Sequence, residues 1–95
     1  DNSLELLNTA CWTVYLKADS RDAIESAVKL MSLVVGKDSQ YAYLDTYAAL
    51  LHKAGKNEEA MDWADKAIRV GKADGQDVKE TEDLLKEIKK APKGK

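Results

Sequence analysis

The chain contains one cysteine, Cys11, and one histidine, His52, the two side chains best suited to nucleophilic or acid–base chemistry. A reactive thiolate needs a nearby base or cation. Cys11 instead belongs to an apolar stripe at helical spacing with Leu4, Leu7 and Val14. We therefore expect Cys11 to be a small buried side chain at a close helix crossing.

Metal and phosphate chemistry has no sequence support. One histidine cannot form a zinc site without further ligands at suitable spacing, and His52 lies one turn before Gly55, where it would meet the negative end of a helix dipole. Asp74 and Asp77 flank a glycine but lack the series of oxygen ligands of a calcium loop. No glycine-rich phosphate loop precedes a helix. The sequence predicts no catalytic residue, no metal and no cofactor, hence no enzyme.

Length and charge limit the remaining functions. The 95 residues allow one domain, with 44% apolar and 34% charged side chains. The 15 basic and 17 acidic residues are mixed along the chain, which argues against a nucleic-acid-binding stripe. The one basic segment, "KKAPKGK", ends in an expected flexible tail at 91–95. The longest apolar run is "LVV", so no membrane span is expected.

Helical periodicity and capping residues predict five helices and no strands. The expected helices cover 4–17, 21–35, 39–54, 57–70 and 77–90. The expected N-terminal caps are Ser3, Ser20, Asp38, Asn57 and Asp77, the last paired with Glu80 in a capping box. The expected stops are Gly36, Gly55, Gly71 and Pro92.

Apolar stripes indicate which face of each later helix is buried. The stripe of the second helix is Ala23, Ala27, Leu30, Met31 and Val34. The third has Tyr41, Leu44, Ala48 and Leu51, and the fourth has Ala60, Ala64, Ala67 and Ile68. The fifth has Val78, Leu85 and Ile88.

The first two helices resemble the next two in sequence. A shift of 37 residues aligns Leu7 with Leu44, Cys11 with Ala48, Val14 with Leu51, Ala27 with Ala64 and Leu30 with Ala67. The two helices of each pair are joined by about three residues, so they must lie antiparallel and close. The pattern therefore predicts a duplicated helical hairpin whose facing positions are small.

The second copy resembles the tetratricopeptide repeat family. The resemblance lies in Leu44, Tyr47, Ala48 and Leu51 of one helix, the turn glycine Gly55, and Ala60, Ala64 and Ala67 of the next helix. Lys72 and Ala64 depart from it, because the family often has a proline and an aromatic residue there. The resemblance implies an all-α superhelix: hairpins at about 4–35 and 39–71 within residues 1–76, then a capping helix at 77–90. It also implies a non-catalytic scaffold that contacts a protein, a peptide or another domain.

A narrower resemblance offers an alternative function. The segment "YLDTYAALLHKAGKNEEAMDWADKAI" is similar to helical regions that follow a thioredoxin-like domain in some bacterial extracytoplasmic proteins. It implies an accessory domain of a thiol-disulfide oxidoreductase and an extracytoplasmic or periplasmic location. This chain has no Cys-x-x-Cys, so any redox chemistry would belong to another part. Because the chain opens without Met, we expect a processed protein or a fragment of a larger one.

A second stripe on the first helix is the candidate contact surface. It consists of Glu5, Asn8, Trp12 and Tyr15, and its equivalents on the third helix are Ala42, Asp45, Ala49 and His52. In the tetratricopeptide family these helices line an inner groove, where two aromatic side chains would hold an extended peptide. The alternative is that both aromatics pack on a neighbouring helix or domain. Because the groove positions hold no lysine, acidic chain termini are not expected to bind. Weak self-association through exposed repeat ends stays open.

Overall fold

The computed structural model describes residues 2–90, and every element in that range is a helix. The helices are α1 (Ser3–Lys17), α2 (Arg21–Lys37), α3 (Tyr41–Lys53), α4 (Asn57–Ala73) and α5 (Lys79–Lys90). The predicted all-α class and helix number are confirmed for these residues. The predicted basic tail and the Pro92 stop lie outside the described range.

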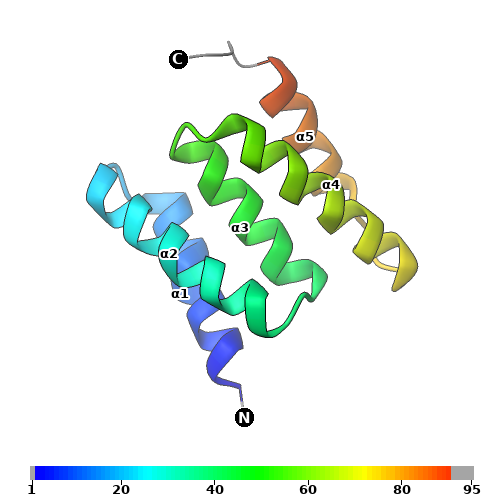
Figure 1. Cartoon of the computed structure of the whole chain (residues 1–95), viewed down its shortest axis with the longest axis horizontal. Helices are drawn as coiled ribbons and strands as arrows, with labels where there is room; N and C mark the ends of the chain where they lie inside the picture. Colours follow the sequence, from blue (N-terminus) through cyan, green and yellow to red (C-terminus); the bar gives the residue numbers. More distant parts are fainter. Residues whose placement is uncertain (1, 91–95) are drawn as a thin grey trace.

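The helices form an inner and an outer layer. α1, α3 and α5 make the inner layer, in which α3 contacts both of the others. α2 and α4 make the outer layer, and each also contacts α3. Figure 1 shows α3 between the first hairpin, α1 and α2, and the pair α4 and α5. The central position of α3 explains why eight of its side chains are buried, Tyr43, Leu44, Thr46, Tyr47, Ala48, Ala49, Leu50 and Leu51.

The two hairpins repeat in length as well as in sequence. Moving α1 and α2 by 37 residues reproduces the bounds of α3 and α4 to within one residue at each end. Cys11 and its equivalent Ala48 are both buried. Leu30, however, is 42% exposed where its equivalent Ala67 is fully buried. The first hairpin packs on one neighbour and the second on two, so the predicted burial of Leu30 is wrong.

Alanine residues provide the close packing that the stripes predict. Ala48 on α3 and the α4 residues Ala60, Ala64 and Ala67 are all 0% exposed. A methyl side chain lets two helix backbones approach closely, so the core is filled from the flanks by larger residues. On α2 those residues are Ile24, Val28 and Val35, which the predicted stripe omits.

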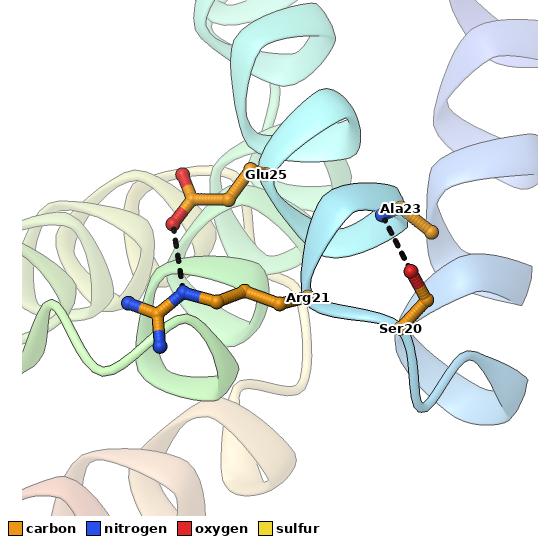
Figure 2. A network of polar contacts seen from close by, with 4 residues as sticks. All are labelled: Ser20, Arg21, Ala23 and Glu25. Carbon is orange, nitrogen blue, oxygen red and sulfur yellow. Dashed lines mark hydrogen bonds and ion pairs between the residues drawn. The ribbon is translucent and has the colours of Figure 1, made fainter.

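The start of α2 is capped as predicted. Figure 2 shows the Ser20 hydroxyl oxygen accepting a hydrogen bond of 3.3 Å from the backbone N–H of Ala23. The same view shows Arg21 paired with Glu25 at 4.0 Å, one helical turn away. A side-chain acceptor here satisfies one of the N–H groups that have no partner inside the helix.

The other predicted caps are wrong in position. Asn2, rather than Ser3, precedes α1, and Gln40, rather than Asp38, precedes α3. Asn57 is the first residue of α4, and its side chain contacts His52 instead of the helix backbone. At the start of α5 the Asp77 carboxylate accepts from the N–H of Lys79 at 3.0 Å, one residue earlier than a capping box requires.

Of the predicted glycine stops, Gly55 is correct, and Gly36 and Gly71 are wrong. Gly55, with a φ of 84°, ends α3 as predicted, and the next N–H, of Lys56, reaches back to the Leu51 carbonyl at 2.9 Å. Gly36 and Gly71 instead lie inside helices, and Gly75, with a φ of 73°, provides the later stop after α4.

Gly71 has a packing role. A Cβ atom at this position would lie 2.4 Å from Val78 Cγ1 and 2.9 Å from Tyr41 Cδ1, which is closer than atoms can pack. The absence of a side chain therefore lets α4 approach α3 and the residue that leads into α5. This contact is one of those that position α5, which forms one wall of the site described below.

A candidate groove between α1, α3 and α5

A groove runs along the inner layer, with α3 as its floor. α1 and α5 are its walls, and over residues 2–90 their Cα atoms nowhere come within 8 Å of each other. Two hollows of ≈ 290 Å³ and ≈ 540 Å³ share Trp12, Asp45 and Glu80. A third of ≈ 380 Å³ adjoins the first through Tyr15 and Glu87. We refer to the three hollows together as the inner groove.

Six of the seven predicted contact residues line the inner groove. They are Asn8, Trp12, Tyr15, Asp45, Ala49 and His52. Glu5 is exposed at the start of α1 and does not line it. The structure therefore brings together residues that are up to 44 positions apart, from Asn8 to His52.

The two aromatic residues of α1 stack on each other. The ring centres of Trp12 and Tyr15 are 4.9 Å apart, with 27° between the ring planes. Both side chains are half-buried, so each still presents surface to the groove. Burial, with smaller contributions from Glu87 and Asp45, raises the pKa of Tyr15, which keeps its hydroxyl neutral.

A lysine lies at one end of this aromatic pair. The Lys53 ammonium group is 5.3 Å from the centre of the Tyr15 ring and donates a hydrogen bond to the Tyr15 backbone carbonyl. A cation over a tyrosine ring is attracted by the ring's negative face. The contact joins the end of α3 to the end of α1 and places a positive charge at that end of the groove.

Asp45 is held in the floor by a chain of hydroxyl groups. Thr81 Oγ1 donates to Asp45 Oδ1 at 2.6 Å, and the Tyr41 hydroxyl lies 2.6 Å from the same Thr81 oxygen. Because Thr81 gives its one proton to the carboxylate, Tyr41 must donate to Thr81. Thr81 is fully buried. Burial raises the pKa of Asp45, the Thr81 bond opposes this rise, and Glu80 adds to it.

The α5 wall is acidic. Glu80, Asp83 and Glu87 face the groove together with Leu84. Asp83 pairs with Lys79 at 3.9 Å, and Glu87 lies 3.9 Å from His52 Nε2. These carboxylates are not among the contact residues predicted from the sequence. Their spacing of three, four and seven residues, which places side chains on one helix face, could have revealed the wall.

His52 lies in the last turn of α3, as predicted. Its Nδ1 is 3.0 Å from Asn57 Oδ1, so Nδ1 carries the proton in this contact. The ring thereby joins α3 to the start of α4, while its other nitrogen faces Glu87 of the groove.

Cys11 is buried as predicted. Its side chain is 2% exposed, and the sulfur lies 3.8 Å from the Ala27 carbonyl of the neighbouring helix. Burial raises the pKa of the thiol, which favours the unreactive protonated form. Within residues 2–90 no group of three or more histidine, cysteine, aspartate or glutamate side chains is placed to hold a metal ion.

Asn8 contributes an acceptor without a donor. Its Oδ1 atom is buried and forms no hydrogen bond within the described part of the chain. Asn8 lines the same hollow as Asp45 and Glu80. A buried acceptor without a partner costs free energy.

The first hairpin also exposes large apolar side chains. Leu6, Leu16 and Leu33 are 60–64% exposed, with Leu7 and Leu30 less so. The weak self-association predicted from the sequence stays a prediction, and light scattering at two protein concentrations would test it. None of the helices formed by residues 2–90 has the length and apolar character needed to cross a membrane.

Comparisons of this chain with protein-family models, with curated proteins and with solved structures find no match. The arrangement of the inner groove is therefore the basis for assigning a function.

Proposed function

We propose that this protein is a non-catalytic docking module, a tetratricopeptide-like scaffold whose inner groove holds an extended segment of another protein or of another domain. The observation that carries this proposal is the groove itself. A row of adjoining hollows with two aromatic side chains on the α1 wall, a carboxylate in the floor and both acidic and apolar side chains on the α5 wall suits a peptide better than a small substrate.

The character of the aromatic wall supports this proposal. Trp12 and Tyr15 supply large contact areas with few rotatable bonds, so little entropy is lost when a partner covers them. The alternative from the sequence is that both rings pack on a neighbouring helix or domain. Both rings are half-buried, so each keeps surface that a peptide or another domain can cover. Two titratable residues favour recognition over catalysis. The Asp45 carboxylate already accepts a hydrogen bond from Thr81, and the Cys11 thiol is buried away from the groove.

Selection from a displayed random peptide library tests the proposal. The selected peptides should bind Trp12→Leu at least about tenfold more weakly, because the aromatic surface is lost. Trp63→Leu is the matched control, since it removes the other tryptophan, on α4, which packs on Tyr47 outside the groove residues. If selection recovers no peptide, or if both variants bind equally well, the proposed function is wrong.

A further inference from the structure

We propose that the segment held by the inner groove is basic, with a lysine or arginine side chain lying along Trp12 and its charged end among the carboxylates of α3 and α5. This inference rests on the proposed docking function and names the chemistry of the partner.

The lining of the inner groove is predominantly acidic. The acidic residues that line the three hollows are Asp45, Asp77, Glu80, Asp83 and Glu87. The one lysine among the lining residues is Lys53, which lies at one end over Tyr15. The protein as a whole has a formal charge of only −2, so negative charge is concentrated in this groove. Such a concave surface attracts cations and repels acidic partners.

Three of these carboxylates, Asp45, Asp77 and Glu80, have no cationic partner within residues 2–90. No lysine or arginine in this range lies within ion-pair distance of any of the three. The neighbouring Asp83 pairs with Lys79, and Glu87 lies beside the His52 ring. Asp45 accepts one hydrogen bond, from Thr81, and its pKa is raised by burial. A carboxylate that accepts a single bond keeps further acceptor capacity, which an arginine or lysine N–H group can use.

The indole ring of Trp12 lies beside these carboxylates. Trp12 lines both of the hollows that contain Asp45 and Glu80. Tryptophan is the strongest aromatic partner for a cation, and the aliphatic stems of lysine and arginine pack on apolar surface such as Leu84 and Ala49. Lys53 already makes this kind of contact with the adjacent Tyr15 ring. The groove therefore offers an aromatic face and unpaired carboxylates to the same side chain.

Binding of three synthetic peptides to the intact chain tests this inference. One is a short peptide in which arginine alternates with glycine and serine, and the other two have glutamine or glutamate at every arginine position. Isothermal titration calorimetry at low salt should give at least about tenfold tighter binding for the arginine peptide than for the glutamine peptide. The glutamate peptide should not bind, and added salt should weaken the arginine complex.

Two double variants that each remove two negative charges show where on the protein the arginine peptide binds. Glu80→Gln with Glu87→Gln should weaken binding of the arginine peptide about tenfold, because it removes two charges from the α5 wall. Asp19→Asn with Asp62→Asn removes the same charge from exposed positions outside the groove, and binding should change less than about twofold. Thermal unfolding of each variant shows whether the fold is retained.

The outcomes separate this inference from the proposed function. If the glutamine peptide binds as tightly as the arginine peptide, or if the two paired variants lose equal affinity, the basic character of the partner is refuted. The docking function still stands in that case, provided that library selection yields peptides that depend on Trp12. If the arginine peptide does not bind and selection also fails, both proposals are wrong.

Discussion

Thr81 of α5 donates a hydrogen bond of 2.6 Å to Asp45 of α3, from a fully buried position. This contact ties the acidic wall of the groove to its floor, and Tyr41 extends it by one more hydroxyl group. Thr81 therefore has two roles. It holds α5 against α3, and its hydrogen bond opposes the rise in the pKa of Asp45.

Replacing Thr81 by valine tests the first role. Valine fills a similar volume but leaves the Asp45 carboxylate and the Tyr41 hydroxyl without their shared partner. We expect the free energy of unfolding to fall by about 1–3 kcal/mol, measured by urea denaturation. Thr81→Ser keeps the hydroxyl and should lose less. A valine variant as stable as the wild type would show that the hydrogen bond contributes nothing.

The charge of Asp45 should appear in the pH dependence of stability. Because burial raises the pKa of Asp45 above its ordinary value of 3.8, the folded state binds its proton more tightly than the unfolded state does. The tighter proton binding stabilises the folded state fully below pH 3.8. This stabilisation is lost as the pH rises through the raised pKa of Asp45.

Asp45→Asn isolates this effect, because asparagine keeps an oxygen that can accept from Thr81. We expect the variant to be more stable than the wild type at neutral pH, with the difference shrinking as the pH falls through the raised pKa of Asp45. Urea unfolding of both proteins across this range is the measurement. A difference that does not vary with pH would contradict the prediction.

Two glycine substitutions should have opposite effects. Gly71→Ala places a methyl group against Val78 and Tyr41, and overpacking of this kind costs about 1–3 kcal/mol. Gly36→Ala is the matched control, since Gly36 lies in α2 with nothing within 4 Å of the new atom. There alanine should stabilise the protein by about 0.5–1 kcal/mol through its better helix propensity. Equal effects on the unfolding temperature would refute the packing role of Gly71.

Cys11 should react slowly in the native protein. The thiol is buried and its pKa is raised by that burial, so little thiolate is present and little of it is accessible. Labelling with a chromogenic disulfide reagent should be far slower in buffer than in urea. Fast labelling of the folded protein would show that the crossing of α1 and α2 opens readily.

Helix number and core were predictable from sequence because both follow from local periodicity. Ala60, Ala64 and Ala67 recur at helical spacing, and all three are fully buried. Leu30 shares that pattern but is exposed, because nothing in the chain described here covers its side of the first hairpin. Gly36 and Gly71 could not be distinguished from Gly55 by residue type, since a glycine inside a helix looks the same in sequence as one that ends it.

The α1 wall and the α3 floor of the inner groove were predictable from the sequence, and the α5 wall was not. Trp12 and Asp45 occupy equivalent faces of two repeated helices, so the repeat places them together. Glu80 and Thr81 belong to a helix outside the repeat, and the fit of Gly71 against Val78 helps to set where that helix lies. The spacing of Glu80, Asp83 and Glu87 places them on one helix face. Where that face packs depends on contacts between distant residues, so its place in the groove required the three-dimensional structure.

The most direct test of the docking groove is a map of backbone amide chemical shifts in the intact chain during titration with the arginine peptide. We expect the shifts to concentrate on the groove-lining turns of α1, α3 and α5, around Trp12, Asp45 and Glu80. Shifts concentrated on α2 and α4, or a spectrum unchanged at saturating peptide, would contradict this expectation.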